Sequence, residues 1–569
     1  MKAWICVFFG LTMVGLNPVS GESKRAPILD DPFLWLEEIE GDRALAWVHD
    51  RNRECFDELE SDARYATFLE QAEALLNAKD RIPYGSVRGR HVYNFWRDAG
   101  HVRGILRRTL LSSYRLAKPE WETVLDIDAL AKSEDENWVY KGTTWLAPGY
   151  RRCLVKLSRG GTDASVYREF DAEAKRFVDG GFMLPEAKSG VAWLDRDTLL
   201  VGTDWGDGSL TASGYPRVAK RWKRGTALAK AGTVFEGRKE DIGIWPRVLD
   251  SGEATLPMVD QSLTFFTGAY HLIGDDDQLQ RLPLPESVDV AGFYAGRILF
   301  TLREAWEIAG WTYSQGALLG IDVAAFRATG ELPRIETVYM PDERTSIEGV
   351  AVSRSGLYVT LLQNVKGRLL RFSVDADSVK WSAEPLPLPP NGTVSLSAAN
   401  PHSETVLVNY EDHITPDRLS EYDAGANALT LLKSLPARFR ADDLQVSQHM
   451  AGSADGELVP YFVIHRKGLK PDGSTPTILY GYGGFEISLK PSYSATIGKL
   501  WLERGGAYAV ANIRGGGEFG PRWHKAALKT NRQRAYDDFI AVAEDLVMRG
   551  ITSPKRLGIS GGSNGGLLV

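Results

Sequence analysis

The chain has 569 residues, of which 43% are hydrophobic and 25% are charged, a composition that excludes a wholly disordered or collagen-like protein. At roughly 150 residues per domain, this length predicts about three or four domain-sized units. The 74 acidic and 67 basic side chains give a formal charge of −7, which argues against a dedicated nucleic-acid-binding protein. Three cysteines exclude a disulfide scaffold.

Residues 1–21 have the pattern of a secretory signal peptide. Lys2 precedes an apolar stretch, and Val19 and Gly21 are placed as the small residues of a cleavage site. An N-terminal membrane anchor is the alternative, but a span needs about 20 apolar residues and this stretch is shorter. We therefore expect a periplasmic or secreted protein without stable membrane insertion after cleavage. Cys55 and Cys153 would remain and would permit one disulfide.

Residues 22–85 are predicted to be a helical segment. Asp31-Pro32 suits a helix start, because proline is tolerated in the first turn. Further on, apolar residues from Phe68 to Leu76 recur at helical spacing among charged residues.

Residues 86–436 alternate short apolar runs with turn residues, which is typical of an all-β domain. Four segments share one pattern, with a small apolar entry, a turn and a strongly apolar strand; they start at Val191, Val290, Val350 and Leu396. Their spacing fits a noisy repeat of roughly 50 residues, so this region predicts a β-propeller of about seven blades. A pair of β-sandwiches is the alternative.

Residues 437–569 have an α/β pattern. Strands are expected at 458–464, 477–480, 507–513 and 557–559, and Phe539, Val542 and Leu546 form one face of an amphipathic helix. Strands that alternate with helices imply a parallel sheet, which binds ligands beyond the carboxyl ends of its strands.

The last predicted strand leads into Gly561-Gly562-Ser563-Asn564-Gly565, a G-x-S-x-G nucleophile elbow. Glycines lack Cβ, so the two outer ones permit the sharp turn that exposes the Ser563 hydroxyl. The backbone N–H of Asn564 is the expected oxyanion donor. A flexible glycine-rich turn is the alternative.

A second glycine-rich loop, Tyr480 to Phe485 (YGYGGF), follows an earlier strand and suits a second oxyanion contact. Tyr482 can add a phenolic O–H donor, and Phe485 can line an apolar pocket. The alternative is a packed turn with buried aromatic rings.

These two motifs, together with NIRGGGEFG at 512–520, WHK at 523–525, SPKRL at 553–557 and DDPFLWLEEIEG at 30–41, resemble the prolyl oligopeptidase family of serine peptidases. The resemblance implies a seven-bladed propeller, here with an incomplete α/β-hydrolase domain at 437–569 and with the 22–85 segment packed against that domain. It also implies hydrolysis of short peptides, with the propeller as a size filter. Ser563 would be the nucleophile, Tyr482 and Asn564 the oxyanion hole, and Phe485 part of the pocket for a proline ring. The YGYGGF loop favours cleavage after proline over cleavage after basic residues.

Other conspicuous residues are interpreted as structural. Arg514-Gly-Gly-Gly lacks the Lys-Ser/Thr of a P-loop, so a turn is expected there. His524 precedes the serine, whereas the hydrolase order is serine, acid, histidine, so a structural or supporting role is expected. The acidic run at 274–277 suits a solvated turn. No spacing predicts a metal site, and we expect no cofactor.

Six residues follow Ser563, whereas the family's acid and histidine come later than the serine. We therefore expect a fragment that is inactive or nearly so, since a serine without a base is a weak nucleophile. Two other functions stay open, a non-catalytic propeller binding protein with a vestigial hydrolase domain and a general esterase. The expected partners are short peptides bound by a monomer.

Overall fold

The computed structural model describes residues 31–274, 276–375 and 380–569, so the predicted signal peptide at 1–21 lies outside the described residues. The chain divides into two compact units, residues 1–77 and 78–569. Within the described ranges, no helix is both long enough and apolar enough to cross a membrane. Cys55 and Cys153 are both free.

The described part of the first unit is helical. A short 3-10 turn, η1 (Leu34–Glu37), precedes two helices, α1 (Asp42–Ser61) and α2 (Tyr65–Leu76). The rings of Trp35 and Trp47 meet edge to face with centroids 6.3 Å apart, and the Arg43 guanidinium lies 4.1 Å from the Trp35 ring. These contacts fix the 3-10 turn on the start of α1. The expected packing of this segment on the catalytic domain remains a prediction.

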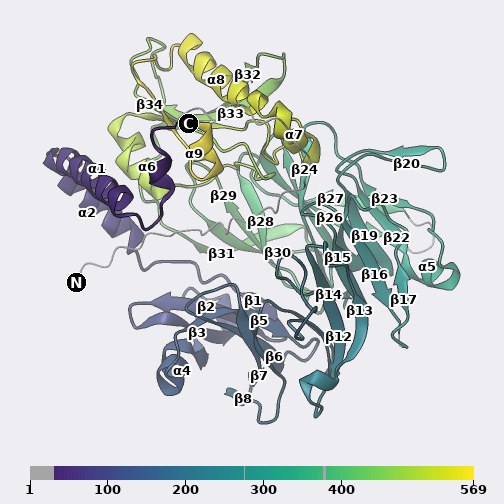
Figure 1. Cartoon of the computed structure of the whole chain (residues 1–569). Coiled ribbons are helices and arrows are strands. Elements are labelled where there is room, and N and C mark those ends of the chain that lie inside the picture. The colour runs from purple at the N-terminus through teal and green to yellow at the C-terminus, as the bar shows by residue number, and fades with distance from the viewer. Residues whose placement is uncertain (1–30, 275, 376–379) are drawn as a thin grey trace. The chain divides into compact units, whose positions relative to one another are not determined.

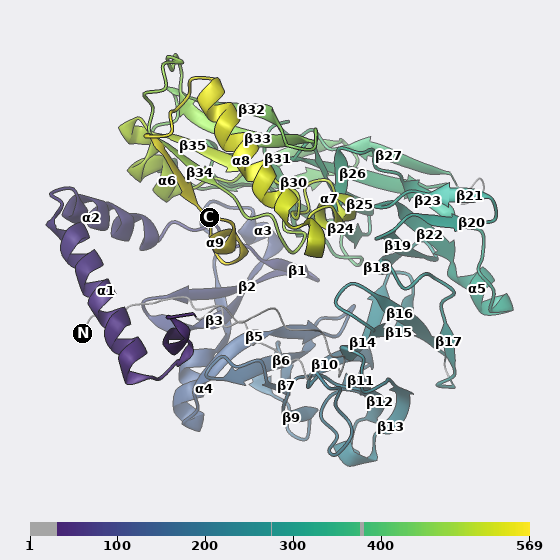
Figure 2. The same cartoon turned by 45° about the horizontal axis from the view of Figure 1, so that its top comes forward.

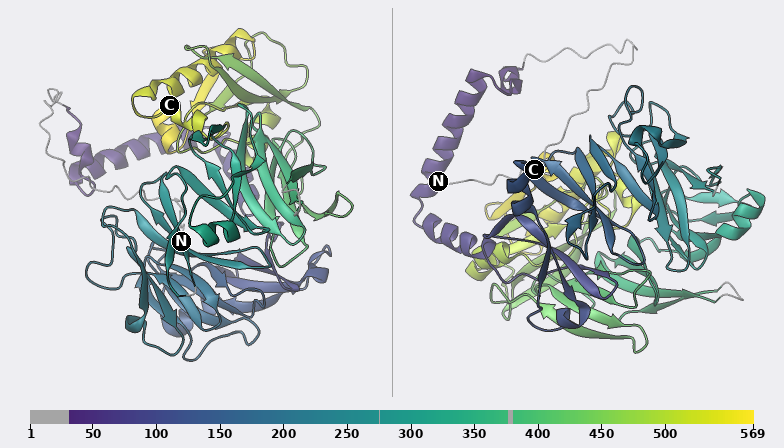
Figure 3. Two further views of the ribbon diagram at one scale, coloured as in Figure 1. Left: turned by 90° about the vertical axis from the view of Figure 1, so that its right-hand side faces the viewer. Right: turned by 90° about the horizontal axis from the view of Figure 1, so that it is seen from below.

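In the described residues, the second unit contains seven antiparallel sheets of four or five strands, the seven-bladed propeller that the repeat pattern predicts (Figures 1 and 3). The first three sheets contain β1 (Ser86–Arg88), β2 (His91–Asp98), β3 (His101–Leu110) and β4 (Glu122–Asp126); β5 (Trp138–Trp145), β6 (Arg152–Arg159), β7 (Ser165–Asp171), β8 (Arg176–Phe177) and β9 (Met183–Ala187); and β10 (Gly190–Asp195), β11 (Thr198–Gly202), β12 (Val218–Lys223) and β13 (Gly232–Glu236). The fourth and fifth contain β14 (Gly243–Asp250), β15 (Thr255–Ser262), β16 (Gly268–Ile273) and β17 (Leu279–Arg281); and β18 (Val288–Tyr294), β19 (Arg297–Leu302), β22 (Leu318–Asp322) and β23 (Glu336–Tyr339), with a separate hairpin of β20 (Trp306–Ile308) and β21 (Trp311–Tyr313). The sixth and seventh contain β24 (Thr345–Ser353), β25 (Gly356–Gln363), β26 (Lys366–Val374) and β27 (Trp381–Pro385); and β28 (Thr393–Ala398), β29 (Val406–Glu411), β30 (Arg418–Asp423) and β31 (Ala428–Ser434). Short helices α3 (Leu111–Tyr114), α4 (Ile127–Glu134) and α5 (Val323–Thr329) lie in the connections.

The four repeated sequence segments occupy the same place in four different blades. Val191, Val290, Val350 and Leu396 lie in the first strand of the third, fifth, sixth and seventh sheets, and each pairs with the second strand of its own sheet. The wide gap between the first two segments spans the fourth sheet. The repeat is therefore the hairpin that opens a blade.

Side chains, rather than a shared strand, join the first and last blades, because each sheet consists of strands from one stretch of chain. Val87 and Val92 of the first sheet pack in one core cluster with Leu407 and Leu419 of the seventh. The Tyr84 hydroxyl adds a hydrogen bond of 2.9 Å to Asn409 Oδ1. These contacts close the ring.

The remaining strands form one five-stranded sheet in the order β32-β33-β35-β34-β36. Its elements are β32 (Leu444–Gly452), β33 (Leu458–Arg466), β34 (Thr477–Tyr480), α6 (Ala495–Leu500), β35 (Ala507–Ala511), α7 (Pro521–Lys525), α8 (Gln533–Met548), β36 (Leu557–Ser560) and α9 (Asn564–Leu568). β34 is parallel to both β35 and β36, as expected. The expectation of a parallel sheet is wrong for the first two strands, because β33 pairs antiparallel with both β32 and β35. β32 and β33 follow each other without a crossover helix, which permits an antiparallel pair.

Helix α8 covers a face of this sheet (Figure 2). Phe539, Val542 and Leu546, the predicted apolar face, are buried against strand residues that include Val463 and Leu479. This packing fixes the sheet whose carboxyl edge carries the glycine-rich loops.

Candidate active site

Ser563 lies in the turn between β36 and α9, with φ +53° and ψ −116°. Positive φ is uncommon for a residue with a side chain and costs of order 1–3 kcal/mol, so the surrounding structure must enforce it. A Cβ on Gly561 would lie 2.1 Å from the Gly565 carbonyl oxygen, and one on Gly565 would lie 2.5 Å from that of Gly481. The turn therefore requires glycine at both positions, as the elbow motif predicts, and the Ser563 side chain is left exposed.

The parallel register brings the second glycine-rich loop beside this elbow. Tyr480 of β34 pairs with Ser560 of β36, so the two chains leave the sheet at the same edge. Asn564 Nδ2 donates a hydrogen bond of 2.5 Å to the carbonyl oxygen of Tyr482. The structure thus brings Ser563 and Asn564 next to the Tyr482 backbone, although Tyr482 and Asn564 are 82 positions apart along the chain.

Phe485, like Ser563, is an exposed residue of the predicted site. Its φ is +53°, and 58% of the residue is accessible to solvent. This ring is not packed away, so the alternative of buried aromatics in a structural turn does not describe Phe485. An exposed phenyl ring is available to an apolar group of a ligand.

Glu486 connects the same loop to the propeller. Its carboxylate forms an ion pair with Arg303, which follows β19, and the side chains are only 18% and 13% exposed. Its backbone N–H donates to the Gly515 carbonyl oxygen at 3.2 Å. The sequence analysis missed Arg303, because nothing in the sequence links residues 183 positions apart.

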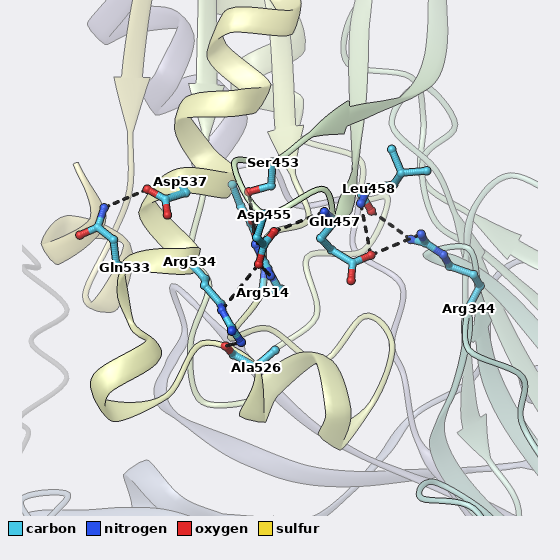
Figure 4. Close-up of polar contacts among 11 residues, drawn as sticks. Arg344, Ser453, Asp455, Glu457, Leu458, Arg514, Ala526, Gln533, Arg534 and Asp537 are labelled. Atoms are coloured by element: carbon cyan, nitrogen blue, oxygen red, sulfur yellow. Dashed lines mark hydrogen bonds and ion pairs between the residues drawn. The ribbon is translucent and has the colours of Figure 1, made fainter.

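Arg514 is buried in an ion-pair network beneath the loop, with Ser453 and Asp455 as two of its partners (Figure 4). Asp538, fully buried on α8, accepts from the Arg514 backbone N–H at 2.9 Å and from its Nη2 at 2.6 Å. Asp455 accepts from Arg514 Nη1 at 2.5 Å. Burial by itself lowers the pKa of Arg514, but the hydrogen bonds with Asp538 and Asp455 outweigh it and raise that pKa above the ordinary value. The glycine-rich run after Arg514 is thus a structural turn, and the Gly515 carbonyl oxygen in it accepts the hydrogen bond from Glu486 of the 483–486 loop.

Glu518 and His524 are buried next to the same segment. Burial raises the pKa of Glu518 to about 7, against backbone and amide hydrogen bonds that lower it. His524 Nδ1 lies 3.7 Å from Glu486 Oε2 and has no hydrogen-bond partner among the described residues. Burial lowers the pKa of His524, so a neutral ring is favoured. Its ring packs 5.3 Å from that of Phe266 in the propeller, which is a supporting position rather than one in contact with Ser563.

A cavity of about 490 Å³ lies beside Glu486, between the fifth and sixth blades and the hydrolase loops. Arg303, Ser346 and Phe519 are among its lining residues, whereas Ser563 is not. In the described ranges no group of three or more His, Cys, Asp or Glu side chains has an arrangement that could hold a metal ion.

Two family models match the chain. The model of the prolyl oligopeptidase family matches residues 491–569, and that of the prolyl oligopeptidase N-terminal beta-propeller domain matches residues 22–252.

Relatives match almost the whole chain. An uncharacterized peptidase of Sinorhizobium fredii, y4nA, is 43% identical over 568 residues, which is 98% of this chain and 78% of the relative. A prolyl endopeptidase of Elizabethkingia miricola is 27% identical, over 95% of this chain and 74% of the relative. The solved structure of a post-proline cleaving enzyme from Rickettsia typhi is 31% identical with a TM-score of 0.84, over 94% of this chain and 79% of that one. With this identity over nearly its full length, and with the strained serine turn in place, the chain belongs to the prolyl oligopeptidase family of serine peptidases.

Proposed function

We propose that the protein is a serine peptidase that hydrolyses short peptides after proline, with Ser563 as the nucleophile. The observation that carries the proposal is the backbone of Ser563, whose positive φ at a strand-to-helix turn exposes the hydroxyl. Strain of this kind persists where the surroundings enforce it, and it concentrates at active sites.

In this mechanism the Ser563 oxygen attacks the scissile carbonyl carbon, and its proton passes to a base and then to the leaving amine. Water then hydrolyses the acyl-enzyme and regenerates the serine. The Asn564 N–H and the Tyr482 hydroxyl stabilise the oxyanion, and the contact between these two segments supports that pairing. Loss of one such donor typically lowers the rate about 10²–10³-fold.

The preference for proline rests on Phe485 and on the relatives. The exposed ring of Phe485 offers a flat apolar surface to a proline ring. Relatives named prolyl endopeptidase, and a post-proline cleaving enzyme of solved structure, support the same specificity. The predicted signal peptide supports a periplasmic or secreted location. We propose that the protein acts on short peptides as a monomer.

The reaction also needs a general base to accept the Ser563 proton. In the part of the chain that the structure describes, Ser563 makes no hydrogen bond to a histidine. We therefore expect the 569 residues alone to turn over peptides slowly, because an unassisted hydroxyl is a weak nucleophile.

The test uses the 569-residue protein with a fluorophosphonate, which reacts with an activated serine, and with two fluorogenic dipeptides that end in proline or arginine. Peptide mapping identifies the labelled residue. Ser563→Ala is the test variant, and Ser560→Ala, an exposed serine three residues earlier, is the matched control.

We expect slow labelling of Ser563, which is lost in Ser563→Ala and kept in Ser560→Ala. We also expect the proline dipeptide to be cleaved faster than the arginine dipeptide. Absence of both labelling and cleavage would contradict the proposal and leave a propeller binding protein. Labelling with cleavage of short acyl esters, but of neither dipeptide, would indicate a general esterase.

A further inference from the structure

Arg532, which directly precedes α8, bridges the two segments of the proposed oxyanion hole. Its Nη1 donates to the Gly483 carbonyl oxygen, and its Nη2 donates to Asn564 Oδ1 at 3.3 Å. In the described residues Arg532 has no carboxylate partner, and its guanidinium lies 5.4 Å from the centre of the Tyr536 ring. The cation is therefore directed at two neutral oxygens, one on each loop.

The Asn564 side chain completes the bridge. Its oxygen accepts from Arg532, and its Nδ2 donates to the Tyr482 carbonyl oxygen at 2.5 Å. Both ends of one amide are thus satisfied by groups of the site, which fixes the side chain in one orientation. Arg532, Asn564 and the Tyr482–Gly483 backbone form one connected set of hydrogen bonds.

The space for this guanidinium depends on glycines. A Cβ on Gly515 would lie 3.4 Å from Arg532 Nη1 and 2.3 Å from the Gly483 carbonyl oxygen. A Cβ on Gly484 would lie 2.5 Å from Asn564 Nδ2. Larger residues at these two positions would displace the groups that the arginine joins.

We propose that Arg532 is a positioning residue of the oxyanion hole, which holds the Tyr482 loop and the serine elbow in register. The proposal rests on the proposed function, because it needs Tyr482 and Asn564 to act as oxyanion donors. The planar fork of arginine presents parallel donors to two acceptors, whereas lysine offers a point charge. Arginine is therefore suited to this bridge in a way that lysine is not.

Loss of Arg532 should slow the chemical step more than it weakens substrate binding. The donors stay in the chain but lose their mutual placement, and misplacement of about 1 Å can lower a rate about 10²-fold. We expect R532A to lower kcat and the rate of Ser563 phosphonylation about 10- to 100-fold, with little change in KM.

The experiment compares wild type, R532A, R532K and a matched control, Arg549→Ala. Arg549 immediately follows the same helix and pairs with Asp545 at 2.6 Å, so its loss tests removal of an arginine near α8. Phosphonylation of Ser563, cleavage of the proline dipeptide and the urea midpoint are measured for each protein, with and without millimolar guanidinium chloride.

We expect the loss in R532A to be partly restored by guanidinium, R532K to lie between R532A and wild type, and Arg549→Ala to match wild type. Restoration by guanidinium separates positioning from general destabilisation. If R532A does not fold, the proposal is tested by the kcat and KM of R532K, in which a lowered kcat with little change in KM is expected. Wild-type rates in folded R532A, or an equal loss in Arg549→Ala, would overturn the proposal for Arg532 alone. A wild-type protein that is neither labelled nor active would overturn the proposed function and this inference with it.

Discussion

Replacement of Asp538 by asparagine should destabilise the hydrolase sheet and its serine loops. The substitution keeps the shape of the side chain but removes the charge that faces Arg514, of which only 4% is exposed. Asp538 accepts from the backbone N–H, Nε and Nη2 of Arg514 and from the Ser453 hydroxyl. An amide has only one oxygen, so its NH₂ group must face one of these donors.

The expected loss of folding stability follows from the burial of the Arg514–Asp538 ion pair. Removal of one partner of a buried ion pair typically costs about 3–5 kcal/mol, because the other charge stays buried and uncompensated. Asp455 still contacts Arg514, and it is itself 40% exposed, so we expect the lower end, about 3 kcal/mol. The matched control is Asp537→Asn. That carboxylate is directed toward Gln533 at 3.0 Å, away from Arg514, and is expected to change stability by less than about 0.5 kcal/mol (Figure 4).

Hydrogen exchange measured by mass spectrometry reports the hydrolase part separately from the propeller. A loss of about 3 kcal/mol should raise the exchange rate of the 507–516 segment roughly a hundredfold, since about 1.4 kcal/mol is tenfold. The propeller segments should keep their wild-type rates. Equal exchange in Asp538→Asn and Asp537→Asn would refute the reasoning that this buried pair holds the loop.

Three further predictions concern the same region. Gly561→Ala should abolish labelling of Ser563, because its Cβ would meet the Gly565 carbonyl oxygen at 2.1 Å, whereas Gly562→Ala, with nothing within 4 Å of its Cβ, should be labelled normally; equal labelling of both would contradict the elbow geometry. Since burial raises the pKa of Glu518 to about 7 from 4.5, its contribution to stability is present below about pH 4.5 and is lost as the pH rises through about 7. Glu518→Gln should therefore gain urea stability relative to wild type between about pH 5 and pH 8, and parallel profiles would contradict this. Arg303→Ala should speed hydrogen exchange of residues 483–488, because it removes the Glu486 partner, whereas Arg297→Ala, which loses a pair with Glu336 inside the propeller, should not; unchanged exchange in Arg303→Ala would show that the propeller does not hold this loop.

Local sequence patterns were sufficient to predict most of the architecture. The hairpin repeat predicted about seven blades, since four of the blades open with the same alternation of small residues, turn and apolar strand and their spacing fits a unit of about 50 residues. The helical face at Phe539, Val542 and Leu546 follows from the 3.6-residue period and is buried as expected. The antiparallel start of the hydrolase sheet was missed. No strand was predicted at Leu444–Gly452, and β33 and β35 were predicted as strands without the antiparallel direction that they have in the sheet.

The sequence by itself determined the serine turn, because Gly561 and Gly565 are short-range requirements of one tight bend. It also identified Tyr482, Asn564 and Phe485 as candidate site residues, whose catalytic roles remain predictions. Only the tertiary structure showed that Arg532 joins the two loops, that Arg303 reaches Glu486 from the propeller, and that Asp538 anchors Arg514. These contacts join residues far apart along the chain, and a charged residue in a sequence carries no mark of whether it will be solvated or buried against a partner.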